Sequence, residues 1–168
     1  MATTILLAID DSECSRAATN ELIEQLRHES TTVHVLHVLE LDKMLPAAFD
    51  FSRGTLYGAE VAAYLQKSRD DAERLVGETA RRLQEAQFST VTTVAEGDPR
   101  HTILNYAAEV GCHCIVMGSH GRLGLDRFFM GSVSEAVVRH AHCSVHVVRT
   151  PSTGLAARAG RPPASADR

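Results

Sequence analysis

The sequence lacks the features of membrane-spanning and nucleic-acid-binding proteins. No apolar stretch reaches the roughly 18 residues that a membrane-spanning helix needs, because charged residues or histidines interrupt the longest runs. Basic residues are not in excess, since the formal net charge is −4 and residues of both signs are interspersed. No basic face is therefore available to neutralise a run of phosphates. We expect a soluble protein whose partners include neither membrane nor nucleic acid.

The sequence also lacks the signals of an exported protein stabilised by disulfide bonds. The amino-terminal residues MATTILLAIDD show neither the basic flank nor the small-residue cleavage site of a signal peptide. The cysteines lie in well-patterned helix and strand sequence and number four: Cys14, Cys112, Cys114 and Cys143. A chain with enough apolar residues for a core needs no disulfide staples. We expect reduced thiols and a cytoplasmic location.

What the chain does contain is an alternation of strand and helix patterns. Continuous apolar runs are typical of parallel strands covered on both faces, and they predict strands at 5–9, 33–39, 91–95, 114–117 and 144–148. Apolar residues at helical spacing predict helices that start at 12, span 59–86, follow 97–99 and cover 133–140. The alternation predicts an α/β fold of three α/β/α layers around a five-stranded parallel sheet.

Local signals predict the helix starts and the remaining segments. Asp98 followed by Pro99 predicts an N-cap and a first helical residue, and Ser132-x-x-Glu135 is typical of a capping box. Residues 40–58 have no clear period and are predicted to be a loop with at most a helical turn. The stretch 150–168 is too polar to offset its ordering entropy, so we expect one domain over 1–149 and a disordered tail.

A glycine-rich loop follows the fourth predicted strand, where an open parallel sheet places its ligand. Glycine lets backbone N–H groups approach an anion closely, and the free amides of a helix start favour phosphate. Ser132 and Ser134 add hydroxyl groups at the predicted helix start. Turn-forming glycines and a helix-capping Ser132 explain the spacing equally well. The glycines are Gly118, Gly121, Gly124 and Gly131.

The spacing Gly118-x2-Gly121-x9-Gly131-Ser132 resembles the nucleotide loop of universal stress proteins, and the likeness extends over residues 3–149. The resemblance implies a Rossmann-like, adenine nucleotide alpha hydrolase-like sheet of strand order 3-2-1-4-5. It implies ATP in a crevice between the first and fourth strands. It also implies a homodimer formed through the last strand, Ser144 to Val148, whose edge would otherwise expose unpaired backbone groups.

The resemblance also implies roles for single residues. Asp10 matches the family aspartate that contacts the ribose, and Met117 and Gly118 match the residues that close over the base. The remaining matches are Ala8 and Val38, which line the adenine pocket, and Gly121, Gly131, Ser132 and Val133, which bind phosphate.

Charged side chains could add to this site. Asp10 could hold Mg²⁺ or Mn²⁺ that bridges the phosphates, because hard cations prefer carboxylate oxygen, or it could only cap a helix. Arg122 and Arg127 could pair with phosphate oxygens, or could be exposed loop arginines. His120 has no assigned role.

Other groupings of reactive residues have less support. Cys112, His113 and Cys114, with Cys143 further on, lack the spacing of structural zinc sites. His34 and His37 differ by an odd number and are expected on opposite faces of a strand.

The function that best fits the sequence is that of an ATP-binding universal stress protein, a dimeric nucleotide-responsive stress regulator. Neither a Walker A order nor a Gly-x-Ser-x-Gly elbow occurs, and no general base is evident, so any ATP hydrolysis is expected to be weak. Two alternatives stay open. One is a slow metal-dependent ATPase that uses Asp10 or Asp11, and the other is a dimeric interaction protein that binds no nucleotide.

Overall fold

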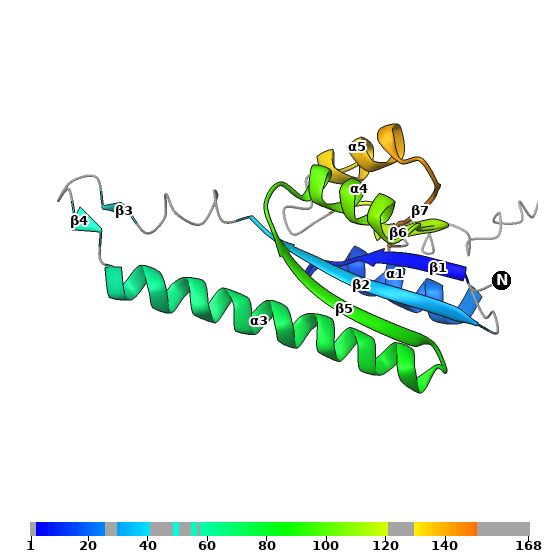
Figure 1. Ribbon diagram of the computed structural model, residues 1–168, viewed down its shortest axis with the longest axis horizontal. Helices are drawn as coiled ribbons and strands as arrows, with labels where there is room; N and C mark the ends of the chain where they lie inside the picture. Colours follow the sequence, from blue (N-terminus) through cyan, green and yellow to red (C-terminus); the bar gives the residue numbers. More distant parts are fainter. Residues whose placement is uncertain are drawn as a thin grey trace, which may run out of the picture.

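The computed structural model describes residues 3–25, 30–40, 49–50, 55–56, 58–120 and 130–150. At its centre lies a five-stranded sheet of order β5-β2-β1-β6-β7, in which every neighbouring pair is parallel (Figure 1). Numbered among themselves, these strands give the order 3-2-1-4-5, so the predicted fold class is confirmed. The strands are β1 (Thr3–Ala8), β2 (Thr31–Leu39), β5 (Ser89–Glu96), β6 (Cys114–Gly118) and β7 (Ser144–Val148).

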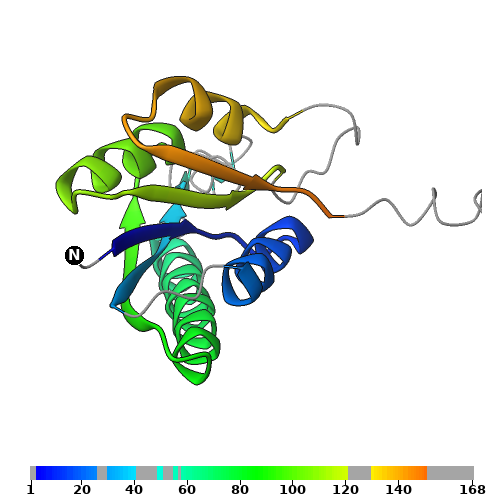
Figure 2. The same ribbon diagram turned by 90° about the vertical axis from the view of Figure 1, so that its right-hand side faces the viewer.

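Helices cover the sheet on both faces, as the alternating pattern predicted (Figure 2). One face carries α1 (Glu13–Gln25) and α3 (Gly58–Glu85), and the other carries α4 (Pro99–Glu109) and α5 (Ser132–His140). No helix in the described part of the chain is long and apolar enough to cross a membrane.

Two apolar clusters, one on each face of the sheet, form the core. Successive side chains of a strand point to opposite faces. Leu7 therefore packs into the cluster under α1 and α3, whereas Leu6 packs into the cluster under α4 and α5. Both leucines are fully buried, and each such burial stabilises the fold by about 1.5–3 kcal/mol. This two-sided burial explains the continuous apolar run of β1.

The start of α4 is confirmed, but the capping box predicted for α5 is wrong. Asp98 accepts hydrogen bonds from the backbone N–H groups of Arg100 and His101, and a proline begins the helix. In α5 the N-cap is Gly131, which provides no side chain, so Ser132 lies one position inside the helix. Glu135 instead accepts a hydrogen bond from Arg139 at 2.8 Å.

Within the 40–58 connection, the described residues 49–50 and 55–56 form a small antiparallel pair, and the predicted helical turn would fall in the residues outside the described part of the chain. Phe49–Asp50 (β3) pairs with Thr55–Leu56 (β4). Two-residue strands are too short to show a period in the sequence. The tail predicted from residue 150 onward lies, beyond that residue, outside the described part of the chain. The next helix, α3, extends past the carboxyl ends of the strands in Figure 1.

Candidate functional site

The three apolar residues predicted for a base pocket come together at the carboxyl end of the sheet. Ala8 on β1 is the register partner of Met117 on β6 and of Leu36 on β2. Val38 lies two residues beyond Leu36, so its side chain is on the same face. Ala8, Met117 and Val38 all belong to the apolar cluster on the α4 and α5 side. They form one surface at the ends of three adjacent strands.

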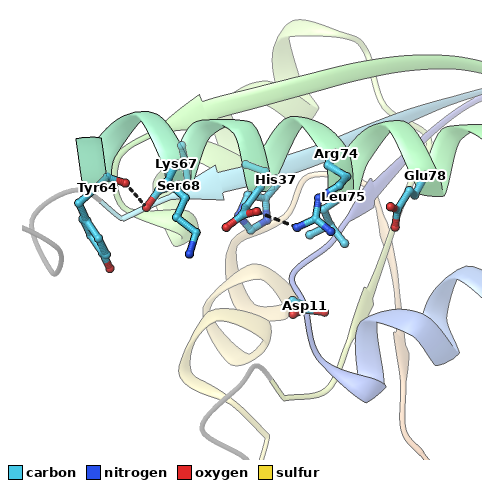
Figure 3. A pocket seen from close by; sticks show the side chains of 11 residues that line it. Asp11, His37, Tyr64, Lys67, Ser68, Arg74, Leu75 and Glu78 are labelled. Atoms are coloured by element: carbon cyan, nitrogen blue, oxygen red, sulfur yellow. Dashed lines mark hydrogen bonds and ion pairs between the residues drawn. The ribbon is translucent and has the colours of Figure 1, made fainter. Parts of the chain in front are cut away.

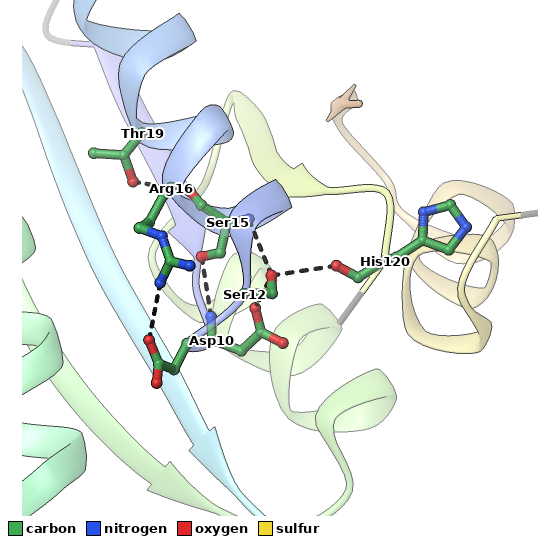
Figure 4. Close-up of polar contacts among 7 residues, drawn as sticks. Asp10, Ser12, Ser15, Arg16, Thr19 and His120 are labelled. Atoms are coloured by element: carbon green, nitrogen blue, oxygen red, sulfur yellow. Dashed lines mark hydrogen bonds and ion pairs between the residues drawn. The ribbon is translucent and has the colours of Figure 1, made fainter. Parts of the chain in front are cut away.

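A tight turn after β1 fixes Asp10 beside this surface (Figure 4). The Asp10 amide donates to Ser15 Oγ at 3.1 Å, and its carboxylate Oδ1 accepts from Ser12 Oγ at 2.6 Å. Ser12 Oγ also accepts the backbone N–H of Ser15 at 3.1 Å. The residue that caps α1 is therefore Ser12. Asp10 is held by this turn without capping the helix, and its side chain stays partly exposed.

Hydrogen bonds tie the end of β6 to this turn and to the start of α5. The Ser119 carbonyl accepts from the Gly131 amide and from Ser134 Oγ, both at 2.8 Å. Ser12 Oγ lies 3.3 Å from the carbonyl oxygen of His120 and can donate to it. Residues far apart in the sequence thus form one hydrogen-bonded frame, which we call the carboxyl-end frame: Asp10, Ser12, Ser119, His120, Gly131 and Ser134.

The two described loop glycines are required by close packing. A Cβ at Gly118 would lie 2.8 Å from the backbone carbon and the Cβ of Cys14, so α1 packs directly on this position. A Cβ at Gly131 would lie 3.1 Å from the carbonyl oxygen of Ser119. Gly131 has a φ of −64° and does not use a positive φ. Close packing, rather than a positive φ, therefore excludes a side chain at Gly131.

The start of α5 offers fewer free groups than its sequence suggested. The Gly131 amide already donates to Ser119, and the buried Ser134 hydroxyl donates to carbonyls of Ser119 and Gly131. The amides of Ser132 and Val133 have no acceptor within the helix, because the first N–H groups of any helix lack one. Ser132 is exposed. An anion at this helix start would meet these two amides and the positive end of the helix dipole.

The sequence did not indicate two polar residues as part of the site: Cys14, which lies beside the frame, and His120, which belongs to it. Burial alone would raise the pKa of the Cys14 thiol. Hydrogen bonds from the side chain and backbone of Thr150, from Ser119 and from the His120 backbone outweigh burial and lower that pKa. His120 Nδ1 lies 2.9 Å from Ser119 Oγ, and its buried Nε2 has no hydrogen-bond partner among the described residues. Serines after a strand-end aspartate are a capping signal that would have revealed Ser12.

Part of the predicted site lies outside the described residues. Gly121, Arg122 and Arg127 fall in 121–129. Asp11 is exposed and pairs with Arg16 at 3.0 Å. Among the residues that the structure describes, no group of three or more histidine, cysteine or acidic side chains could hold a metal ion.

A recess of about 330 Å³ lies on the other face of the sheet, between α3 and the end of β2 (Figure 3). Of the residues considered for the site, only Asp11 lines it. Asp71 and Glu78 also line it beside Lys67 and Arg74, and Arg74 is paired with Asp71 at 2.7 Å, so the recess has no excess of positive charge for a polyphosphate. His37 lines it with Nδ1 2.8 Å from the Ile9 carbonyl oxygen.

The opposite orientation of the two β2 histidines is confirmed. His37 lines the recess under α3, whereas His34 Nδ1 lies 3.1 Å from the Tyr106 hydroxyl on α4. At the strand ends, the described side chains that match the predicted site therefore lie in the carboxyl-end frame and not in the recess.

Sequence comparison identifies the family. The sequence model of the universal stress protein family matches residues 1–149, so this chain belongs to that family. The chain is 28% identical over 153 residues to the universal stress protein YxiE of Bacillus subtilis, a match that covers 89% of this chain and 100% of YxiE.

Solved structures share the fold. The protein MJ0577 superimposes with a TM-score of 0.76 at 23% identity, covering 91% of this chain and 99% of MJ0577. A universal stress family protein of Arabidopsis thaliana, solved with AMP bound, gives 0.60 at 19% identity, with 90% and 94% coverage. The universal stress protein of Archaeoglobus fulgidus in complex with dAMP gives 0.59 at 17% identity, with 88% and 98% coverage.

Proposed function

We propose that this chain binds an adenine nucleotide, with ATP as the expected ligand, at the carboxyl end of β1 and β6. The observation that carries the proposal is the carboxyl-end frame, which joins Asp10 to the start of α5 through Ser12, His120 and Ser119. The frame puts a carboxylate, an apolar surface and a helix start at one edge of the sheet. A nucleotide needs these three environments for its ribose, base and phosphates.

The described residues fit such a ligand part by part. Ala8, Val38 and Met117 offer apolar contact to the base, and the Asp10 carboxylate can accept hydrogen bonds from ribose hydroxyls. The amides of Ser132 and Val133 can donate to phosphate oxygens. A divalent cation such as Mg²⁺ or Mn²⁺ could bridge Asp10 and the phosphates, since both are hard oxygen ligands. Gly121, Arg122 and Arg127 are proposed to complete the phosphate contacts.

The nucleotide-bound relatives support the adenine part of this proposal. The Arabidopsis and Archaeoglobus proteins share the fold and were solved with AMP and dAMP. We expect occupancy rather than hydrolysis to be the signal, because no general base for phosphoryl transfer is evident in the sequence. Binding to the folded state alone would stabilise the fold in proportion to nucleotide concentration. We propose a stress regulator in the cytoplasm that responds to nucleotide in this way.

We further propose a homodimer formed through β7, Ser144–Val148. This strand pairs with β6 and ends the sheet, so its outer backbone groups have no partner strand among the described residues. Pairing with a second copy would satisfy them. Light scattering on the purified protein should give the mass of two chains, and the mass of one chain at micromolar concentration would contradict this proposal.

Purified protein provides the first test of nucleotide binding. Gentle purification followed by acid release and ion-exchange chromatography should yield an adenine nucleotide, and calorimetry on nucleotide-free protein should rank ATP, AMP and cyclic AMP. We expect ATP to bind more tightly than AMP because the extra phosphates would reach the start of α5. Absence of released ligand, together with no heat and no thermal shift with any of the three, would reject the proposal.

A substitution at Ser132 tests the helix start directly. Proline fits the first position of a helix, and Gly131 has a ψ of 151°, which a following proline requires. Ser132→Pro therefore removes one N–H group while keeping the helix, and a charge-assisted hydrogen bond is worth about 1.5–3 kcal/mol, or roughly 10–100-fold in affinity. Ser132→Ala is the matched control, which keeps the amide. Equal ATP affinity of the two variants, with unchanged circular dichroism, would exclude this amide from the site.

A further inference from the structure

Three of the cysteines lie at the opposite, amino end of the sheet, away from the carboxyl-end frame. Cys112 and Cys114 flank the turn that enters β6, and Cys143 directly precedes β7. The register of β6 and β7 pairs Cys114 with Ser144, so the two chain segments run side by side. All four cysteines of the chain are free thiols.

The two faces of the sheet select one pair among these three thiols. Cys112 belongs to the apolar cluster under α4 and α5, and Cys143 packs against that same cluster. Cys114 packs against the cluster on the other face, under α1 and α3. The thiols of Cys112 and Cys143 are near enough to interact electrostatically.

Backbone contacts hold Cys112 at this place. Its amide donates to the Ala107 carbonyl at 2.9 Å, and the next amide, that of His113, donates to the Thr4 carbonyl at 2.9 Å. The Cys112 thiol donates to the Cys114 carbonyl at 3.0 Å. On the other side, α5 ends at its C-cap Ala141, two residues before Cys143. These hydrogen bonds fix the backbone near both thiols, and a disulfide between them requires a Cα separation of about 4.4–6.8 Å.

The two thiols differ in exposure. Cys112 is buried, and burial, followed by the charge that Cys143 would carry as a thiolate, raises the pKa of Cys112 to about 12. Cys143 is partly exposed. An oxidant from solvent therefore reaches Cys143 first. Cys112 is then the thiol that attacks the oxidised sulfur of Cys143.

We propose that Cys112 and Cys143 form an intramolecular disulfide when the protein meets hydrogen peroxide. The Cys143 thiolate attacks one peroxide oxygen, the O–O bond breaks, and hydroxide leaves and takes up the thiol proton as water. Cys143 is then a sulfenic acid. The Cys112 sulfur attacks the Cys143 sulfur, the S–S bond forms and the S–O bond breaks, and the departing hydroxide takes the Cys112 proton as a second water. Two thiols are oxidised and one peroxide is reduced to two waters.

The disulfide would close a loop that contains β6, residues 121–129 and α5, and so all the residues proposed to contact phosphate. Closing a loop of this size restricts the unfolded chain, so the oxidised protein should melt about 5–10 °C higher than the reduced protein. Dithiothreitol should return the melting temperature to its starting value.

Peptide mapping tests the pair on the full-length protein. The reduced chain is treated with hydrogen peroxide, free thiols are blocked with N-ethylmaleimide, and the chain is digested with trypsin without reductant. Trypsin places Cys112 and Cys114 in peptide 101–122 and Cys143 in peptide 140–149. Because peptide 101–122 contains two cysteines, the variant Cys114→Ser shows which of them is cross-linked. We expect the cross-linked pair in wild type and in Cys114→Ser, and its loss in Cys143→Ser.

Thermal melting is the second readout and does not depend on peptide recovery. Wild type and Cys114→Ser should both show the rise on oxidation, and Cys143→Ser should show none. Because Cys143 is partly exposed, its serine variant should fold, which circular dichroism of the reduced form checks. The proposal is overturned if peroxide leaves Cys112 and Cys143 open to N-ethylmaleimide. Conversion of Cys143 only to sulfinic acid, or its linkage to Cys14 or to a second chain, would overturn it too.

Discussion

The two ends of the central sheet place the same chemical group in opposite environments. At the carboxyl end, Cys14 lies in the first turn of α1, where hydrogen bonds from Thr150, Ser119 and His120 outweigh burial and lower the thiol pKa. At the amino end, burial raises the pKa of Cys112 to about 12 and also raises that of Cys114. The hydrogen bonding and burial of each thiol, rather than the residue type, therefore decide which thiol ionises.

The two ends also differ in the groups that the direction of the strands places there. In a parallel sheet each helix begins just after the carboxyl end of a strand, so free N–H groups and positive dipole ends gather there. These groups favour a bound anion such as a phosphate. The proposed nucleotide site and the proposed disulfide thus lie at opposite ends of one sheet.

The largest expected effect is on thiol reactivity. Cys14 has a pKa below its ordinary value of 9.0 and Cys112 one of about 12, so a far larger fraction of Cys14 is thiolate at pH 7. After allowance for the weaker nucleophilicity of the more acidic thiolate, Cys14 should react with iodoacetamide about 50-fold faster or more. Raising the pH should bring Cys14 to its plateau rate first. Mass spectrometry of the native protein over time measures this, with urea-unfolded protein as control. Similar native rates would remove the proposed contrast between the two ends.

The next largest effect is expected at Gly118, where the carboxyl end is most tightly packed. Gly118→Ala places a Cβ against Cys14 and should lower the free energy of unfolding by about 2–3 kcal/mol. Gly77→Ala is the control, because a Cβ there meets nothing within 4 Å and helix propensity should raise stability by about 0.5–1 kcal/mol. Urea titration of both variants gives the comparison. A Gly118→Ala protein as stable as wild type would show that α1 does not pack as described.

A smaller loss is expected when the carboxyl-end frame loses one hydroxyl. Ser134 is 2% exposed and donates to Ser119 and Gly131. Ser134→Ala should lower the free energy of unfolding by about 1 kcal/mol, because one buried hydrogen bond disappears while the Gly131 amide still satisfies the Ser119 carbonyl. Ser132→Ala, at an exposed position, should change it by less than about 0.5 kcal/mol. Equal urea midpoints for the two variants would contradict the hydrogen bonds described for the Ser134 hydroxyl.

The smallest effect is expected at the amino end. Thr31, at the start of β2, is buried, and its hydroxyl has no hydrogen-bond partner among the described residues. Thr31→Val should raise the free energy of unfolding by about 0.5–1 kcal/mol, since it removes an unpaired polar group and keeps the shape. Thr32→Val, at a partly exposed position, should change stability less. A loss of stability in Thr31→Val, measured by calorimetry, would mean that the hydroxyl is hydrogen-bonded in solution.

Much of the fold could be predicted from local pattern. Strands buried on both faces are continuous apolar runs, so β1 and β6 were evident, and the cap formed by Asp98 before Pro99 depends on adjacent residues. The opposite faces of His34 and His37 follow from the period of a strand alone. The pattern failed at Ser132, because helix α5 begins one residue earlier than its capping motif suggests.

The candidate site was predictable only in outline. The glycine spacing pointed to the correct edge of the sheet, but packing reasons for Gly118 and Gly131 involve Cys14 and Ser119, which no local rule connects to them. The contact of Ser12 with His120 could not be predicted for the same reason, since it joins residues 108 positions apart.

The sequence by itself determined the order of strands and helices, because the period of apolar residues along the chain sets which faces must be buried. Tertiary structure decided which glycine packs against which helix, which serine contacts the His120 carbonyl and which cysteine shares an apolar cluster with Cys143. Those outcomes depend on contacts between distant segments, and such contacts form only when the sheet brings its strand ends together.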